Sequence, residues 1–294
     1  MALKIVQRLV SAVASLKRAL RYWRGNNAPG RFIKRSYANR AGTRAYKTYL
    51  PARYCGQSLP LVVMLHGCKQ TPDDFAAGTR MNQLADQLGF IVIYPAQAQG
   101  ANFSRCWNWF WPRDQQRDEG EPSLIAGMTR QVIERHNVDA RRVYVAGLSA
   151  GGAMAAIMGT TYPDLYAAVG VHSGLPYASA RDAISALAAM QGRRTGAAGP
   201  LPSVPTIVFH GDRDTTVHPR NGACAIADAE LQSETGETGG RAYTRTVRRG
   251  RPSLEHWLVH GAGHAWSGGN AKATYTDPTG PDATREMLRF FAIG

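Results

Sequence analysis

Runs of apolar residues recur along the chain and alternate with amphipathic stretches. Continuous apolar runs are typical of parallel strands that are covered on both faces of a sheet. We predict strands at residues 61–65, 90–94, 143–146, 167–171, 206–209 and 254–259. Residues 45–50 alternate between apolar and polar side chains and are followed by Pro51, which predicts an edge strand.

Between these strands, apolar residues fall at helical spacing. We predict helices at residues 73–88, 123–136, 153–158 and 282–292. The alternation of strands and helices predicts an α/β fold, with a mostly parallel central sheet and helices on both faces. Residues 97–122, which are rich in aromatic side chains, and residues 175–205, which are rich in Ala, Gly and Pro, are predicted to be loops.

The sequence Gly-Leu-Ser-Ala-Gly at residues 147–151 lies between a predicted strand and a helical stretch. In this context Gly-x-Ser-x-Gly is typical of a nucleophile elbow, in which a sharp turn exposes the serine at the end of a sheet. The two glycines remove side chains that would clash in so tight a turn. The five residues alone are a weak pattern, and the strand and helix around them make Ser149 the candidate nucleophile.

A serine hydroxyl needs a base to take its proton and a third group to orient that base. In α/β hydrolases the acid and then the histidine follow the serine, each after a strand. Asp214, after the strand at 206–209, is the predicted orienting carboxylate. Asp212 is its rival, and Asp214 is preferred because it lies farther into the loop.

His264, which follows the strand at 254–259, is the predicted general base. His218 and His260 are its rivals; we interpret the first as a buttress of the site and the second as a packed or hydrogen-bonded residue. Histidines at 256, 260 and 264 have a spacing that would suggest a metal site on a helix. The β-rich run and the glycines at 261 and 263 disfavour a helix, so we predict no metal.

The attacked carbonyl becomes an oxyanion, which needs fixed hydrogen-bond donors. One predicted donor is the backbone N–H of Ala150, directly after the nucleophile. The other should come from the loop after the first central strand, where His-Gly-Cys stands at residues 66–68. The N–H of Cys68 is the candidate.

Several segments together resemble the polyhydroxybutyrate (PHB) depolymerase-type esterases, a branch of the α/β hydrolases, over roughly residues 40–290. The segments are Leu-His-Gly-Cys-Lys-Gln-Thr at 65–71 with Asp-Asp-Phe at 73–75, Arg-Cys-Trp-Asn-Trp-Phe at 105–110, Gly-Leu-Ser-Ala-Gly-Gly at 147–152 and Gly-His-Ala-Trp-Ser-Gly-Gly at 263–269. The resemblance implies an α/β-hydrolase fold, a triad of Ser149, Asp214 and His264, and Cys68 at the oxyanion hole.

The resemblance also implies hydrolysis of carboxylic esters without a metal or organic cofactor. Substrates in the family include short-chain polyhydroxyalkanoates, and related enzymes cleave aryl, feruloyl and acetyl esters of polysaccharides. A serine peptidase or acyltransferase on the same fold is the alternative. Secreted depolymerases of this kind usually carry a signal peptide and a polymer-binding domain. The chain shows neither pattern, so we expect soluble esters or oligoesters as substrates.

The charge is concentrated at one end. The formal net charge is +14, and residues 1–72 hold 14 Lys or Arg but no Asp or Glu. The rest of the chain is neutral, which argues against a nucleic-acid partner. We predict a basic arm and linker at residues 1–40 and one catalytic domain at 41–294. An amphipathic helix at 3–20 would make weak contact with a membrane surface; a surface helix or tail is the preferred alternative.

No apolar stretch is long enough to span a membrane. The family resemblance implies an extracellular protein, and the absence of a clear signal-peptide pattern makes the cytoplasm the alternative.

The aromatic segment carries Trp107 and Trp109, which we expect either to line the substrate site or to pack on the domain. Trp266, two residues after His264, is expected to contact substrate. Cys68 and Cys106 both lie in segments that carry the resemblance. We therefore hypothesise a disulfide between them if the protein is exported. Cys55 and Cys224 could form a second pair, for which the even number of cysteines is the only indication.

Overall fold

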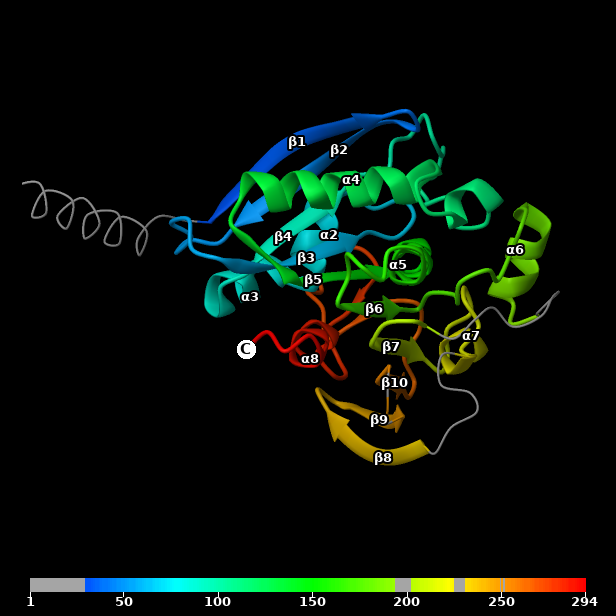
Figure 1. Cartoon of the computed structure of the whole chain (residues 1–294). Coiled ribbons are helices and arrows are strands. Elements are labelled where there is room, and N and C mark those ends of the chain that lie inside the picture. Colours follow the sequence, from blue (N-terminus) through cyan, green and yellow to red (C-terminus); the bar gives the residue numbers. More distant parts are fainter. Residues whose placement is uncertain (1–29, 194–201, 225–230, 249, 251) are drawn as a thin grey trace, which may run out of the picture.

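A single large sheet organises the chain (Figure 1). The computed structural model describes residues 30–193, 202–224, 231–248, 250 and 252–294. Its ten strands lie in the order β1-β2-β4-β3-β5-β6-β7-β10-β9-β8. The predicted amphipathic helix at residues 3–20, and the membrane contact expected of it, lie outside the described residues. Within the described residues, no helix combines the length and the apolar character needed to cross a membrane.

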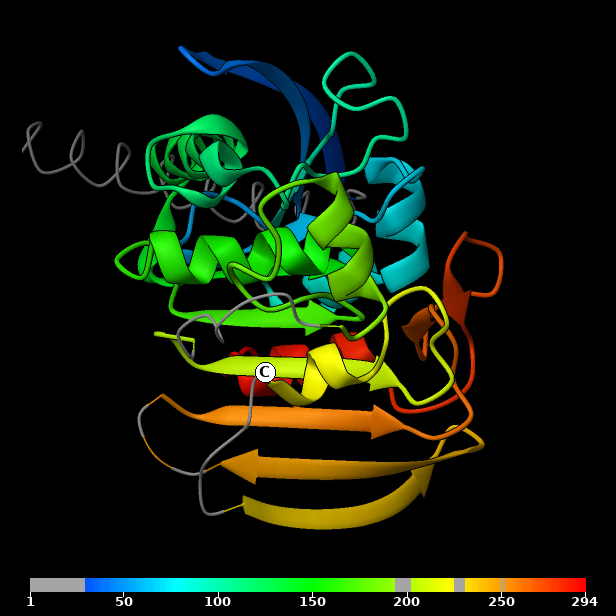
Figure 2. The ribbon, with the colours of Figure 1, turned by 90° about the vertical axis from the view of Figure 1, so that its right-hand side faces the viewer.

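The strands of this sheet are β1 (Arg31–Asn39), β2 (Gly42–Leu50), β3 (Leu59–Leu65), β4 (Ile91–Pro95), β5 (Val138–Leu148), β6 (Ala168–His172), β7 (Thr206–Gly211), β8 (Leu231–Thr238), β9 (Arg241–Arg248) and β10 (Leu254–Val259). The six strands from β4 to β10 in sheet order run parallel. Antiparallel pairs add β1 and β2 at one edge and β9 and β8 at the other. Figure 2 shows the strands stacked across the molecule.

Helices cover both faces, as the sequence predicts. They are α2 (Pro72–Thr79), α3 (Met81–Leu88), α4 (Gly120–Arg135), α5 (Ala150–Thr161), α6 (Ala183–Met190), α7 (Arg220–Ala223) and α8 (Ala283–Phe290), with a 3-10 turn η1 (Pro112–Gln115). One buried cluster joins the sheet to α4, α5 and α6, and a second joins it to α2, α3 and α8. In Figure 1, α5 and α8 accordingly lie on opposite sides of the sheet. Two short strands, β11 (Trp266–Ser267) and β12 (Thr276–Asp277), form a separate parallel pair.

Several expectations need correction. The helix predicted at 73–88 is divided at Arg80, whose left-handed backbone (φ 54°) ends α2 and precedes α3. The predicted boundary at residue 40 falls inside the sheet, because β1 pairs with β2 along its whole length. The strands β8 and β9 and the helix α6 were not predicted. β8 is largely exposed and β9 has a single buried residue, and neither strand carries a continuous apolar run. The Ala-rich helix α6 lies in the segment 175–205, which was predicted to be a loop.

The turn between β5 and α5 is as tight as its glycines suggest. Ser149 has φ 56° and ψ −120°, a strained conformation for a residue with a side chain. A Cβ atom on Gly151 would lie 2.1 Å from the carbonyl oxygen of Leu65, at the end of β3. The helix therefore begins against the backbone of the neighbouring strand, and only glycine fits.

Replacing Gly151 with Ala should destabilise the fold by about 3 kcal/mol or more, because the clash is with backbone rather than with a flexible side chain. Thermal unfolding measures the effect. Gly100→Ala is the matched control, since a Cβ atom there meets nothing within 4 Å. Equal unfolding midpoints for the two variants would contradict the close approach of β3 and α5.

Candidate active site

Three residues predicted to act together follow the carboxyl ends of strands that are close in the sheet. Ser149 follows β5, Asp214 follows β7 and His264 follows β10. Loops at the carboxyl ends of parallel strands meet at one edge of a sheet, where α/β proteins bind their ligands. The sheet therefore brings the three predicted residues to the same edge.

The acid and the histidine are in direct contact. Asp214 Oδ2 lies 2.7 Å from Nδ1 of His264. The carboxylate is fully buried, whereas the His264 side chain keeps 11% of its surface exposed. A histidine held through Nδ1 presents Nε2 on the other side of the ring, which is the orientation that a general base requires.

The Asp214 carboxylate is surrounded by donors. Its Oδ1 accepts from the N–H groups of Thr216 (2.9 Å) and Val217 (2.8 Å). Its Oδ2 also lies 3.4 Å from Nε2 of His210. Burial on its own would raise the pKa of Asp214, but the hydrogen bonds from His210 and His264 outweigh it and hold the pKa well below the usual range. Asp214 is therefore ionised at neutral pH.

The rival residues are engaged elsewhere. Asp212 pairs with His260, with 3.0 Å between Oδ2 and Nδ1, and its Oδ1 accepts from the N–H of Gly261. His218 Nδ1 accepts from the N–H of Arg220. Neither rival histidine has a hydrogen bond with Asp214 among the described residues, so the geometry favours the pair that the sequence preferred.

A buried histidine that the sequence analysis did not single out connects the serine to the histidine loop. The N–H of Ser149 donates to the carbonyl of His172 (2.9 Å), and the N–H of Ser267 donates to His172 Nε2 (3.0 Å). Burial first, and then the nearby His210 and His264, lower the pKa of His172 to about 3, so its ring is neutral. Its place at the end of a predicted strand was the only signal in the sequence.

Among the described residues, the Ser149 hydroxyl makes no hydrogen bond to His264. Such catalytic hydrogen bonds are often long in enzymes without substrate and tighten when substrate binds. Ser149 as a whole is partly exposed.

The predicted oxyanion donors flank the serine. Ala150 is the first residue of α5, where N–H groups lack an acceptor within the helix. Cys68 follows the end of β3, and β3 pairs with β5 up to Leu65 opposite Gly147. No carbonyl in the described part of the chain accepts from the N–H of Cys68. The oxyanion role of the two N–H groups stays a prediction.

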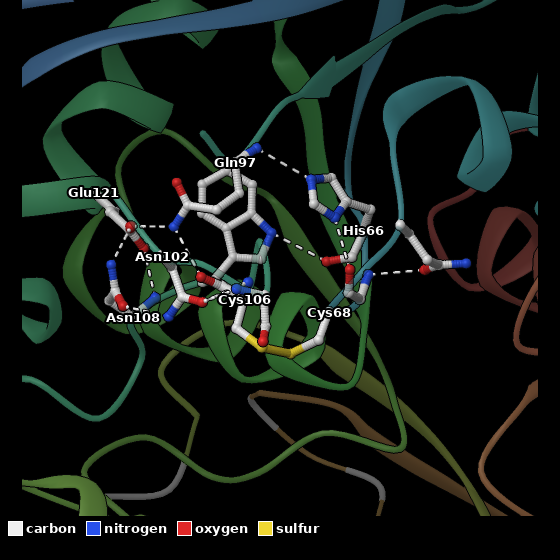
Figure 3. The surroundings of a disulfide bond; sticks show 11 residues. His66, Cys68, Gln97, Asn102, Cys106, Asn108 and Glu121 are labelled. Atoms are coloured by element: carbon white, nitrogen blue, oxygen red, sulfur yellow. Dashed lines mark hydrogen bonds between the residues drawn. A yellow bond between two sulfur atoms is a disulfide. The ribbon is translucent and has the colours of Figure 1, made fainter. Parts of the chain in front are cut away.

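A disulfide joins Cys68 to Cys106, as hypothesised (Figure 3). Two hydrogen bonds reinforce the connection: Trp107 Nε1 donates to the carbonyl of His66 (3.1 Å), and the N–H of Lys69 donates to the carbonyl of Ser104 (2.7 Å). The loop at 66–69, which we call the oxyanion loop, is thus fixed to the aromatic segment.

The second hypothesised disulfide is absent. The Cys55 thiol is exposed and contacts Oε1 of Gln57 instead of bonding to Cys224.

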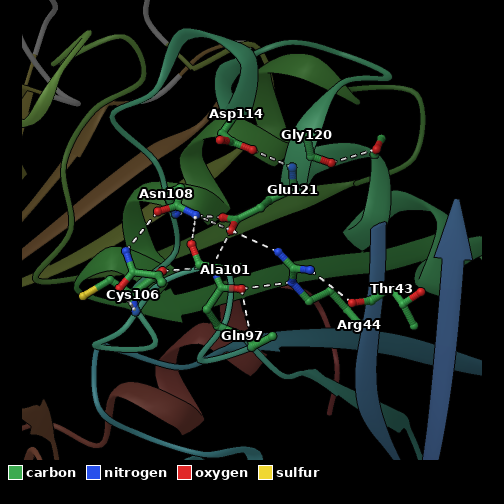
Figure 4. A network of polar contacts seen from close by, with 12 residues as sticks. Thr43, Arg44, Gln97, Ala101, Cys106, Asn108, Asp114, Gly120 and Glu121 are labelled. Atoms are coloured by element: carbon green, nitrogen blue, oxygen red, sulfur yellow. Dashed lines mark hydrogen bonds and ion pairs between the residues drawn. The ribbon is translucent and has the colours of Figure 1, made fainter. Parts of the chain in front are cut away.

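The aromatic segment is in turn fixed by one buried carboxylate (Figure 4). Glu121 Oε2 accepts from the N–H of Asn108 (2.7 Å), and Oε1 accepts from the side-chain amides of Asn108 (2.8 Å) and Gln97. Burial first, and then the neighbouring carboxylate of Asp114, raise the pKa of Glu121 to about 7 against these hydrogen bonds. A carboxyl group that is neutral over part of the physiological range thus supports the segment.

The tryptophans expected to contact substrate pack inside the protein. Trp107 and Trp266 are 0% and 1% exposed, and Trp109 is 6% exposed. Trp266 Nε1 donates to Thr284 Oγ1, and its ring stacks on His172. Indoles so buried offer a substrate almost no surface, so packing, the alternative interpretation, describes them. Trp111, in contrast, is 44% exposed.

Among the described residues, no cluster of three or more His, Cys, Asp or Glu side chains is arranged to hold a metal ion. Within the same described residues, His256 Nε2 is buried and makes no hydrogen bond. Burial lowers the pKa of this histidine to about 4.

Removing the disulfide with Cys68→Ala/Cys106→Ala should lower the free energy of unfolding by about 3–4 kcal/mol, because the bond closes a loop across 38 residues. Chemical denaturation measures the loss. Cys55→Ala, at an exposed thiol, should change stability by no more than about 0.5 kcal/mol. Equal stability of the double variant and the wild type under oxidising conditions would contradict this role.

Glu121 should make stability depend on pH. Its pKa in the folded protein, about 7, lies above the 4.5 of an ordinary glutamate, so the neutral form stabilises the fold below pH 4.5. This contribution is lost as the pH rises through 7. Relative to Glu121→Gln, wild-type stability should fall by about 3 kcal/mol between about pH 4 and pH 8. Glu119→Gln, at an exposed position, is the control; a flat difference for Glu121→Gln would refute the assignment.

Residues 44–243 match the family described as esterase PHB depolymerase. The chain is 33% identical to poly(3-hydroxyalkanoate) depolymerase C of Paucimonas lemoignei over 70% of its own length, and spans 54% of that relative. It is 29% identical to feruloyl esterase B of Neurospora crassa, over 87% of the chain and 90% of the relative.

The structure is similar to that of an acetyl xylan esterase from Aspergillus awamori. The TM-score is 0.69 at 21% identity, and the match covers 89% of this chain and all of the other. At this identity the likeness establishes the fold alone, which is that of the α/β hydrolases. Together with the family match, these findings show that the chain belongs to the esterase PHB depolymerase family and is a carboxylic ester hydrolase.

Proposed function

We propose that the protein hydrolyses carboxylic esters through an acyl-enzyme formed on Ser149, with His264 as general base and Asp214 as the group that orients it. The observation that supports this most strongly is the 2.7 Å contact between Asp214 Oδ2 and His264 Nδ1, at the edge of the sheet where Ser149 follows β5. An ionised, buried carboxylate at this distance fixes the tautomer of the imidazole and stabilises the imidazolium that forms during the reaction.

The reaction proceeds in two halves. Ser149 Oγ attacks the ester carbonyl while His264 Nε2 takes the hydroxyl proton, and the tetrahedral intermediate collapses as His264 returns that proton to the departing alcohol. Water then attacks the acyl-serine, His264 takes a proton from it, and the acid is released as the proton returns to Ser149. The N–H groups of Cys68 and Ala150 stabilise the oxyanion in both halves; one such donor contributes about 2.7–4 kcal/mol in the transition state.

The proposed substrates are short-chain hydroxyalkanoate esters or oligoesters. The family match and the similarity to a depolymerase support this class. Feruloyl or acetyl esters of polysaccharides are the second candidate, because feruloyl esterase B matches over nearly its whole length. Peptide cleavage and acyl transfer on the same fold would show as hydrolysis of amides or as product partition toward added alcohols.

The proposed compartment is extracellular. Disulfides form and persist in oxidising environments and are rare in the cytosol, and the bond between Cys68 and Cys106 supports this placement.

Asp214→Asn should lower kcat for p-nitrophenyl butyrate about 10³–10⁴-fold, because a neutral amide orients the wrong tautomer. Ser149→Ala should be inactive. Asp212→Asn is the matched control: this aspartate lies two residues away and pairs with His260. It should keep kcat within about threefold of wild type. Equal losses for the two aspartate variants, or turnover by Ser149→Ala, would overturn the proposed triad.

The same preparations decide the substrate. Wild type and Ser149→Ala are incubated with an amorphous PHB suspension, with methyl ferulate and with acetylated xylan. Clearing of PHB or release of hydroxybutyrate oligomers by wild type alone supports the hydroxyalkanoate proposal. Release of ferulate or acetate without any action on hydroxybutyrate esters would move the assignment to a polysaccharide esterase.

A further inference from the structure

His66 is a buried histidine that the proposed chemistry does not use, although it lies directly before Gly67 and Cys68. Its exposed fraction is 1%. Its Nδ1 is 2.8 Å from the carbonyl oxygen of Gly67, and its Nε2 is 3.1 Å from the backbone nitrogen of Gln97. Figure 3 shows the ring beside Gln97.

The two contacts fix the tautomer of His66. A backbone N–H only donates, so Nε2 must accept from Gln97, and a carbonyl only accepts, so Nδ1 carries the hydrogen and donates to Gly67. A protonated ring would direct a second N–H at that of Gln97. The pKa of His66, which burial lowers to about 4, agrees with a neutral ring at physiological pH.

This hydrogen bond also fixes the direction of the proposed oxyanion donor. The carbonyl of Gly67 and the N–H of Cys68 belong to one peptide group, and in a planar trans peptide they point in opposite directions. Holding the carbonyl of Gly67 toward the imidazole therefore turns the N–H of Cys68 away from it. The N–H of Gln70 holds the same carbonyl from a second direction, at 3.3 Å.

We propose that His66 is a positioning residue of the oxyanion hole: its neutral Nδ1–H tautomer sets the plane of the peptide between Gly67 and Cys68 so that the N–H of Cys68 points into the catalytic site. The inference rests on the proposed function, because it takes that N–H as an oxyanion donor.

The ring itself is held from outside the loop. Trp107 Nε1 donates to the carbonyl of His66, and the centroids of the indole and imidazole rings are 5.6 Å apart. The Gln97 side chain donates to Glu121 and to the carbonyl of Cys106, which fixes the backbone that faces Nε2. The peptide plane at the serine is thus connected through His66 to the buried Glu121.

Two substitutions separate this role from simple packing. In His66→Asn the side-chain amide can donate from near the position of Nδ1. In His66→Gln the amide reaches the position of Nε2, so the Gly67 carbonyl loses its side-chain donor and keeps only the longer hydrogen bond from the N–H of Gln70. Both variants keep a buried amide of similar polarity. His256→Gln, at another buried histidine, on β10, controls for the loss of a buried ring.

We measure kcat and KM for p-nitrophenyl butyrate, with active-site concentration determined by titration, and the inhibition constant of a trifluoromethyl ketone that forms a tetrahedral adduct with the serine. His66→Gln should lower kcat by about 10²-fold or more, the loss typical of one oxyanion donor, and leave KM within about threefold. Its inhibition constant should rise in parallel. His66→Asn and His256→Gln should keep kcat within about tenfold of wild type.

Equal kcat values for His66→Asn and His66→Gln would overturn the inference, as would a change confined to KM or to the fraction of active sites. The result is distinct from failure of the proposed function: if Ser149→Ala retains turnover, the triad itself is wrong. If Ser149→Ala is inactive while His66→Gln retains kcat, only the role of His66 is refuted.

Discussion

The close approach of β3 and the start of α5 is the constraint on which the rest of the site depends. The backbone of Leu65 occupies the space that a side chain at Gly151 would need. This contact brings the loop after β3 next to the turn that carries Ser149. The loop after β3 can approach Ser149 so closely only because Gly151 has no side chain. The strained backbone of Ser149 is held in place by the same contact and by the hydrogen bond from its N–H to His172.

Two buried carboxylates of the protein, those of Asp214 and Glu121, have pKa values shifted in opposite directions. The Asp214 carboxylate is surrounded by histidine and backbone donors, and its pKa is lowered. The Glu121 carboxylate, equally buried, has a second carboxylate nearby, and its pKa is raised. The lowered pKa of Asp214 keeps this carboxylate charged beside the imidazole of His264. The raised pKa of Glu121 suits a structural group. Its hydrogen bonds, rather than its charge, help to fix the aromatic segment to the loop at 66–69.

The sequence predicted those features that depend on local pattern. The buried parallel strands have continuous apolar runs, and the sharp turn at Ser149 has its glycines, so the fold class and the tight turn could be predicted. The choice of Asp214 over Asp212 as the orienting acid stays a prediction, which the contact between Asp214 and His264 supports. Features set by tertiary contacts did not follow. The edge strand β1 has too few apolar positions to be recognised, and the three tryptophans have the same sequence pattern whether they line a site or fill a core. The roles of His66 and His172 depend on which backbone groups face their rings, and a single sequence carries no such information.

The most direct test of this account is to identify the acylated residue. The protein is quenched in acid during turnover of p-nitrophenyl butyrate and analysed by peptide mass mapping. The account predicts one butyryl group on the peptide that contains Ser149, and its absence from Ser149→Ala. A butyryl group on another residue, or hydrolysis without any acylated peptide under conditions in which deacylation is slow, would contradict it.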